Sequence, residues 1–134
     1  MATLADVRRI ALSLPGTEEA PDRSGFGVRN GGKLQGFVHT WRKRVDARKP
    51  KVPQPDVLVV RVASLEDKAF LLGLDATKFF TEPHYDGFPA VLLRLPAVTA
   101  RELRAIITEA WRCRAPEGLE PKARAPSRRT RSSP

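Results

Sequence analysis

The stretch from Phe79 to Leu95, FFTEPHYDGFPAVLLRL, decides the fold because it joins two strand-like runs through a turn dipeptide. Asp86-Gly87 lies between the runs, and both residue types suit the positive φ angles of a type I′ turn. The stretch therefore predicts a β-hairpin with this turn. The run that follows, Ala90–Leu95, is nearly continuous in apolar residues, which is typical of a strand covered on both faces. We expect that strand to lie centrally in a sheet.

Toward the N-terminus, the sequence predicts a second hairpin and a further strand. Gly25–Arg29 and Lys33–Trp41 flank Asn30-Gly31, another dipeptide that favours tight turns. On the second of these strands Phe37, His39 and Trp41 are expected to share one face, because side chains alternate along a strand. The segment Val57–Val62 is rich in β-branched residues and predicts a third strand.

Three helices are indicated by their N-terminal capping residues. Thr3 with Asp6, Ser64 with Asp67, and Thr99 with Glu102 have the spacing in which a hydroxyl side chain caps the first turn. The second of these helices is expected to turn Leu65, Ala69 and Leu72 inward. The resulting order, α-β-β-β-α-β-β-α, predicts a single α+β domain in which an antiparallel sheet packs against helices.

Length and charge suggest one domain followed by a basic tail. A chain of 134 residues can bury a core without disulfides or metals. Of the formal net charge of +9, residues 114–134 contribute +4. This end of the chain is rich in Pro, Arg and Ser and holds one sizeable aliphatic residue, Leu119, so it buries little apolar surface. We therefore predict a folded domain over residues 1–114 and a disordered tail over 115–134.

Several functional classes find no support in the sequence. One cysteine, Cys113, and two histidines are too few for an internal disulfide or a four-coordinate zinc site. No phosphate-binding glycine loop, nucleophile elbow or HExxH motif is present. The N-terminal turn is charged and long apolar runs are absent, so we expect no signal peptide and no membrane span. We expect a cytoplasmic protein that is not an enzyme and carries no metal or cofactor.

Three segments resemble the MmcQ/YjbR-like family of small bacterial proteins. They are VRRIALSLPGTEE (residues 7–19), KFFTEPHYDGFPAVLLRL (78–95) and ELRAIITEAWR (102–112), and the likeness extends over about residues 4–114. The resemblance implies an antiparallel sheet with helices against it. Members of the family are usually described as DNA-binding, because their paired hairpins look like a double-wing arrangement. None of the three segments is a catalytic signature.

The densest cluster of charge lies between the second and third predicted strands. Residues 42–51 contain one acidic residue, Asp46, and six basic residues, namely Arg42, Lys43, Arg44, Arg48, Lys49 and Lys51. A basic hairpin tip can neutralise phosphates and release counterions, so these six residues are our candidate nucleic-acid contacts, with DNA the expected ligand and no sequence specificity. Two alternatives remain: a solvated loop that prevents edge pairing, and a contact with an acidic protein or a membrane surface.

A second candidate site combines aromatic and histidine side chains. Trp41 and His39 lie on one predicted strand, while His84 and Tyr85 adjoin the Asp86-Gly87 dipeptide. Together they could line a small pocket for a ligand or a protein partner, or Trp41 could stack on a base. The alternative is structural, with each side chain packed or hydrogen-bonded to hold the hairpin. A metal would need a third ligand such as Asp86 or Glu82.

Overall fold

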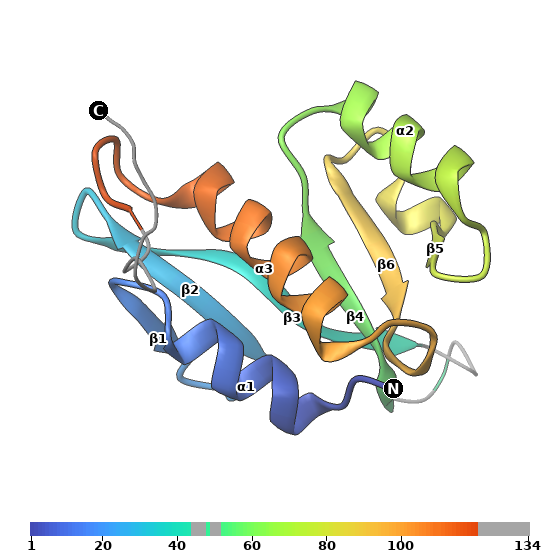
Figure 1. Ribbon diagram of the computed structural model, residues 1–134, viewed down its shortest axis with the longest axis horizontal. Helices are drawn as coiled ribbons and strands as arrows, with labels where there is room; N and C mark the ends of the chain where they lie inside the picture. The colour runs from blue at the N-terminus through green and yellow to red at the C-terminus, as the bar shows by residue number, and fades with distance from the viewer. Residues whose placement is uncertain (44–47, 49–51, 121–134) are drawn as a thin grey trace.

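The computed structural model describes residues 1–43, 48 and 52–120. Three helices and an antiparallel sheet of six strands in the order β1-β2-β3-β4-β6-β5 make up the described part, as Figure 1 shows. The strands are β1 (Thr17–Glu19), β2 (Gly25–Asn30), β3 (Lys33–Lys43), β4 (Val52–Arg61), β5 (Phe79–Phe80) and β6 (Ala90–Arg94). The helices are α1 (Leu4–Leu12), α2 (Leu65–Leu74) and α3 (Ala100–Arg114), with short 3-10 helices η1 (Pro83–Tyr85) and η2 (Leu95–Ala97). The predicted single-domain α+β fold is confirmed.

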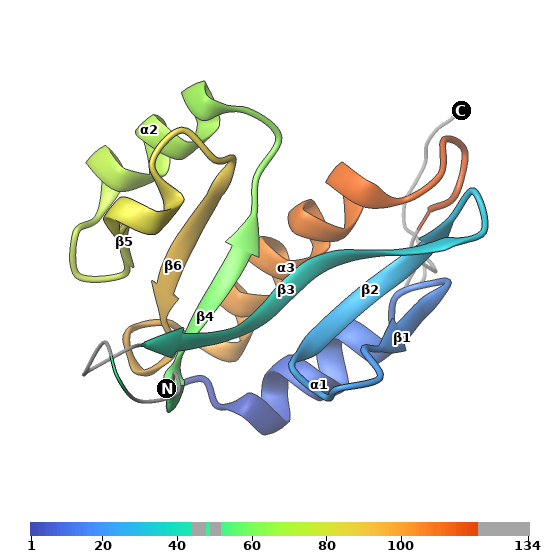
Figure 2. The ribbon, with the colours of Figure 1, turned by 180° about the vertical axis from the view of Figure 1, so that it is seen from behind.

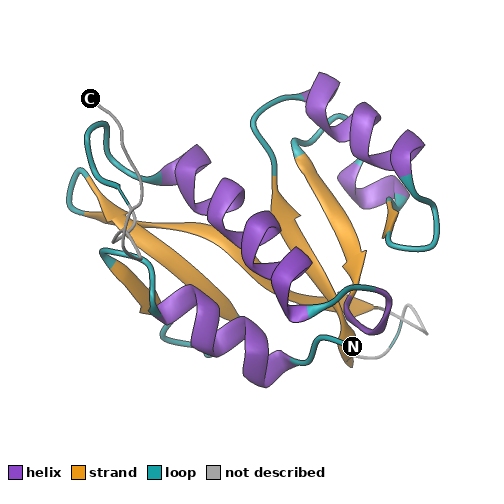
Figure 3. Cartoon of the chain, viewed as in Figure 1, coloured by secondary structure: helices purple, strands orange, loops and turns teal. Residues whose placement is uncertain are grey.

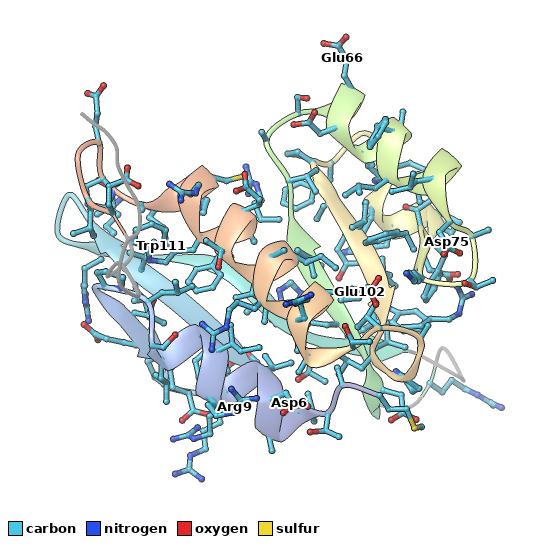
Figure 4. The ribbon with its side chains drawn as sticks, viewed as in Figure 1. Asp6, Arg9, Glu66, Asp75, Glu102 and Trp111 are labelled. Carbon is cyan, nitrogen blue, oxygen red and sulfur yellow. The ribbon has the colours of Figure 1, made fainter. Side chains whose placement is uncertain are left out.

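Helices α1 and α3 lie side by side on one face of the sheet and enclose the main core (Figure 3). Both begin at the predicted capping boxes, Thr3 with Asp6 and Thr99 with Glu102. Trp111 of α3 is fully buried, and its indole Nε1 donates a hydrogen bond of 2.9 Å to the carbonyl oxygen of Pro15 (Figure 4). The end of α1 is thereby tied to the end of α3.

Strand β1 is an element that the sequence pattern did not predict. It has three residues, two of them glutamates, and pairs with β2 at the edge of the sheet. Short, charged edge strands of this kind resist further pairing but carry too few apolar residues to show a period of two. The β2–β3 turn also differs by one residue from the prediction: Asn30 pairs with Lys33, so Gly31 and Gly32, both with positive φ, form the turn.

A bulge in β3 separates Phe37 from its predicted neighbours. Phe26 pairs with Val38 while Gly27 pairs with Gly36, which leaves Phe37 as an extra residue on β3. Phe37 consequently enters the main core beside Val38. The expectation that Phe37, His39 and Trp41 share one face is therefore wrong for Phe37.

The hairpin predicted from Phe79–Leu95 forms, but its turn is of another kind. β5 and β6 are antiparallel, as expected of a hairpin, with Phe80 opposite Leu92. Residues 81–89 connect them through η1 and a turn closed by a hydrogen bond of 3.0 Å from the Phe88 amide to the Tyr85 carbonyl. Asp86 has φ −61° and ψ 132°, and Gly87 has φ +74°, as in a type II turn, so the predicted type I′ turn is wrong.

Strand β6 is covered on both faces, as its apolar run predicted. Val91 and Leu93 belong to the main core, whereas Ala90 and Leu92 belong to a second cluster on the opposite face. β6 is not at the centre of the sheet, because only the two-residue strand β5 lies beyond it. That short strand, together with η1, is sufficient to cover the side chains of β6.

Helix α2 is rotated relative to its prediction. Of its three predicted inward residues, Leu72 packs against the main core but Leu65 and Ala69 are exposed, and the buried residue of the helix is Lys68. The Lys68 ammonium donates to two carbonyl oxygens of the 81–89 connection, those of Tyr85 and, at 3.0 Å, Phe88. A charged side chain is buried at low cost when carbonyl oxygens accept its hydrogen bonds, so Lys68 anchors this connection to α2.

The described part of the predicted tail lies against the domain. Leu119 packs on the main core, and the Arg112 guanidinium contacts the Glu120 carboxylate at 2.8 Å. Residues 121–134 lie outside the described residues, so the disorder expected there stays a prediction. In the described part of the chain no helix is long and apolar enough to cross a membrane.

Candidate functional site

The side of the sheet opposite α1 and α3, which faces the viewer in Figure 2, is here called the open face. Trp41 and Tyr85 of the predicted aromatic site pack around the apolar cluster on this face. The strand register defines it, because one row of paired residues crosses four strands, from His39 to Val59 to Leu92 to Phe80. The described side chains that this register places on it from β3 to β6 are His39, Trp41, Val57, Val59, Arg61, Phe80, Ala90, Leu92 and Arg94.

Aromatic rings form a connected group on the open face. The Trp41 and Phe80 ring centroids are 5.8 Å apart in an edge-to-face arrangement. Trp41, Phe80 and Tyr85 pack around the second cluster of Val59, Ala90 and Leu92 and remain partly exposed. Tyr85 in turn lies 6.4 Å from Phe88 and 5.0 Å from His84, measured between ring centroids. Partial burial raises the pKa of the Tyr85 phenol above its ordinary value.

Two arginine side chains lie over rings of this group. The Arg94 guanidinium carbon is 4.1 Å from the Phe80 centroid, and that of Arg61 is 5.0 Å from the Phe88 centroid. Both distances are within the range of cation–π attraction. The side chains that β4, β5 and β6 direct to the open face include two arginines, and the exposed carboxylate of Asp56 lines a depression with Val57 and Arg94 at one end of it, so the surface is aromatic and mainly positive.

The four residues predicted as a pocket are distributed along this face. Trp41 and Tyr85 contact the same apolar cluster, and His84 is exposed beside Tyr85. His39 is exposed further along β3, where it borders a shallow depression of about 690 Å³ on β2 and β3. The depression is floored by Gly25, Gly27 and Gly36 and also reaches Asp22 and Ser24. The structure thus brings two of the four together, places His84 next to them, and leaves His39 at a separate hollow.

Sequence reasoning missed four members of the face: Phe80, Phe88, Arg61 and Arg94. Phe80, Arg61 and Arg94 belong to strands that were predicted, whereas Phe88 belongs to the turn whose type was predicted wrongly. Nothing local indicated which of these side chains would be adjacent. The alternation of Ala90, Leu92 and Arg94 on one side of β6 was a usable signal. That alternation does not indicate the register with β4, which places Arg61 opposite Ala90.

The basic segment 42–51 connects β3 to β4. The backbone of Arg42 pairs with Pro53 and that of Lys43 with Val52, which puts both residues at the end of the β3–β4 ladder. Arg48 is exposed. Arg44, Lys49 and Lys51 lie outside the described residues. Trp41 immediately precedes the segment, so the basic run begins where the aromatic group of the open face ends.

A separate groove of about 330 Å³ lies between α2 and α3 over the end of β4. Its walls are mainly apolar and include Phe70, Leu71 and Ile106, and Cys113 stands at one side. Burial raises the pKa of the Cys113 thiol, and the Glu109 carboxylate adds to that effect, so the thiol is a poor nucleophile at neutral pH. Within residues 1–43, 48 and 52–120, no three His, Cys, Asp or Glu side chains gather as a metal site would require.

Comparison with known proteins gives relatives but no activity. No family model matches the chain. It is 39% identical over 124 residues to the uncharacterised proteins Rv2570 of Mycobacterium tuberculosis and Mb2600 of Mycobacterium bovis, a match that covers 89% of this chain and 93% of each relative. The crystal structure of Deinococcus radiodurans protein DR2400, a DUF419 domain, aligns with a TM-score of 0.60 and 20% identity over 83% of this chain and 77% of that one. That likeness supports the fold.

Proposed function

The chain belongs to the same family as the mycobacterial protein Rv2570, and we propose that it is a non-enzymatic nucleic-acid-binding protein. Binding is weak, not sequence-specific and directed mainly at phosphates, and DNA is the expected ligand. We also propose that the chain is related to the MmcQ/YjbR proteins and shares their double-wing arrangement of hairpins. A cytoplasmic location, where nucleic acid is accessible, is part of the same proposal.

The observation that carries the proposal is the position of the basic segment at one end of the β3–β4 ladder. The ladder pairs Arg42 and Lys43 with the first residues of β4, and the sheet beside it presents a face that α1 and α3 do not cover (Figure 2). The sequence holds six basic residues between positions 42 and 51, so the described end of the ladder leads directly into the densest cluster of basic residues in the chain. Contacts between these charges and phosphates do not read base edges, so we expect no sequence preference.

Phosphate-directed binding has a quantitative signature. Neutralising about six phosphates on duplex DNA gives a slope of about −5 in a plot of log affinity against log salt concentration. Affinity should consequently fall about a thousandfold between 50 and 200 mM salt. Fluorescence anisotropy of a labelled duplex of mixed sequence would measure this slope.

Two variants of equal net charge test whether the basic segment is responsible. In the first, Arg44, Arg48 and Lys49 are changed to Ser, and in the second Arg8, Arg101 and Arg104 on α1 and α3 are changed to Ser. We expect the first to lose about half of the salt slope and the second to retain it, because contacts depend on position and not on total charge. Equal losses in both variants, or a parent protein with a flat salt response, would contradict the proposal.

A ligand-binding module is the second candidate, and the hollow beside His39 favours it. Gly36 is exposed there with nothing within 4 Å of a Cβ placed on it, so a small planar molecule could approach the strand backbone at this position. A parent protein that gains thermal stability from a metabolite, and none from DNA, would support this candidate in place of the first.

A further inference from the structure

We infer that the open face binds single-stranded nucleic acid, by stacking unpaired bases on Trp41 and Phe88 and on the guanidinium planes of Arg61 and Arg94. This inference rests on the proposed function and adds the class of nucleic acid and the contact surface. All four residues are described: Trp41 and Arg94 lie on the open face, Phe88 lies beside it, and Arg61, which the register places on the face, also lines the groove between α2 and α3.

The first argument is the exposure of the rings. Phe88 is 43% exposed, although exposing a phenyl ring to water is unfavourable. Trp41 is also partly exposed beside its contact with Phe80. An exposed phenyl ring at a tight turn is not needed to form a type II turn, which requires only Gly87 at its second central position. Rings of this kind on a sheet surface are typical stacking platforms for bases.

The second argument is the arrangement of the arginines. A guanidinium is planar and positively charged, so one that lies over a ring can also stack with a further planar group. Arg94 over Phe80 and Arg61 over Phe88 are both in this position. A base stacked there would lie close to a charge that also attracts the neighbouring phosphate.

The third argument excludes a duplex from the same surface. In a duplex the bases are stacked on each other and their flat sides are inaccessible, so the rings could contact only sugar and phosphate. A single strand can turn its bases onto a sheet while the charges of Arg61 and Arg94 attract its phosphates. Single-stranded and duplex ligands should therefore share the salt-dependent part of binding and differ in the part that persists at high salt.

The test compares oligo-dT with a duplex of equal length in salt titrations of the full-length protein. The slope reports phosphate contacts, and the affinity extrapolated to 1 M salt reports stacking. We expect Phe88→Leu to lower that extrapolated affinity for oligo-dT about tenfold with an unchanged slope, because leucine is apolar but has no ring face. Phe88→Tyr should retain it. Phe70→Leu on α2, where the ring is 67% exposed away from the open face, is the matched control and should behave as the parent.

Tryptophan fluorescence gives an independent readout that does not depend on stability. The chain has two tryptophans, and Trp111 is fully buried in the core. Oligo-dT should quench the emission of the parent protein and leave that of Trp41→Phe unchanged. The inference would be overturned if Phe88→Leu and the parent bound oligo-dT equally well at high salt, or if oligo-dT did not quench the emission of the parent. If duplex binding still depended on salt in that case, the proposed function would survive. No binding to either ligand would overturn both.

Discussion

At the residue scale, Glu102 shows how one carboxylate serves two elements. Its Oε1 accepts the Thr99 amide at 2.9 Å in the capping box of α3, and its Oε2 accepts the Lys78 ammonium at 2.6 Å. These contacts, the Lys78 bond first, hold the pKa of Glu102 below its ordinary value, and the same pair raises the pKa of Lys78. Figure 4 shows Glu102 at the start of α3.

This pairing predicts a specific sensitivity to acid. Because the folded-state pKa of Glu102 is lowered, its stabilising contribution is fully present above the unfolded-state pKa of about 4.3 and is lost as pH falls through the lower folded-state value. Glu102→Gln should therefore lower the melting temperature at pH 7 but have a diminishing effect toward pH 3. Thermal melts across this range would measure the difference. Glu66→Gln, also in the first turn of a helix but fully exposed, is the control, and a pH-independent effect of Glu102→Gln would contradict the account.

Single residues were predictable where their role is local. Thr3, Ser64 and Thr99 each accept the amide hydrogen bond that their spacing predicted, since a cap involves residues three apart in sequence. Lys68 was not predictable, because its carbonyl partners lie 17 and 20 residues away and a buried lysine has no local pattern. Helical periodicity instead favoured its apolar neighbours Leu65 and Ala69.

At the scale of elements, the turn at residues 85–88 fixes how the aromatic rings are presented. A type I′ turn would have joined two long strands directly and aligned Tyr85 with Phe88 across a ladder. The observed type II turn follows η1 and is anchored by Lys68, so Tyr85 folds back over the second cluster while Phe88 remains exposed. The Asp-Gly dipeptide suits both turn types, and for this reason the sequence could not distinguish them.

The two turn types make opposite predictions for Asp86. In the observed turn Asp86 has negative φ and Gly87 positive φ, and nothing lies within 4 Å of a Cβ placed on Gly87. Gly87→Ala should therefore destabilise the protein by about 1–2 kcal/mol through backbone strain alone, whereas Asp86→Ala should have almost no effect. Urea unfolding of both variants would measure this. Similar losses for the two would indicate a turn in which both residues need positive φ.

Larger elements were predictable as far as their patterns are regular. Helices α1 and α3 follow their apolar periodicity closely, and strands β2, β3 and β6 lie where strands were predicted, whereas β4 begins at Val52 and not at the predicted Val57. The bulge at Phe37 interrupts that period without any signal in sequence, and the three-residue strand β1 is too short to show one. The prediction of the candidate site was affected most, because Arg61, Phe80 and Arg94 become neighbours of the predicted residues only through the register between strands.

At the scale of the whole molecule, the two faces of the sheet differ in how many side chains they bury. One face carries the main core under α1 and α3, which includes the largest buried side chains, Trp111 and Phe37. The other needs only a small cluster of three buried residues, around which the partly exposed rings are arranged. The asymmetry leaves a broad aromatic and basic surface beside the β3–β4 connection, and the proposed function and the further inference both depend on it.

The most direct test of this account is a ¹H–¹⁵N NMR titration of the labelled protein with oligo-dT. We predict chemical-shift changes in the amides of Trp41, Arg61 and Phe88 and in the indole of Trp41, which belong to the open face. The Trp111 indole, bonded to Pro15 inside the core, should not move. Changes confined to α1, α3 or the groove between α2 and α3, or a spectrum that oligo-dT leaves unaltered, would contradict the assignment of nucleic-acid binding to the open face.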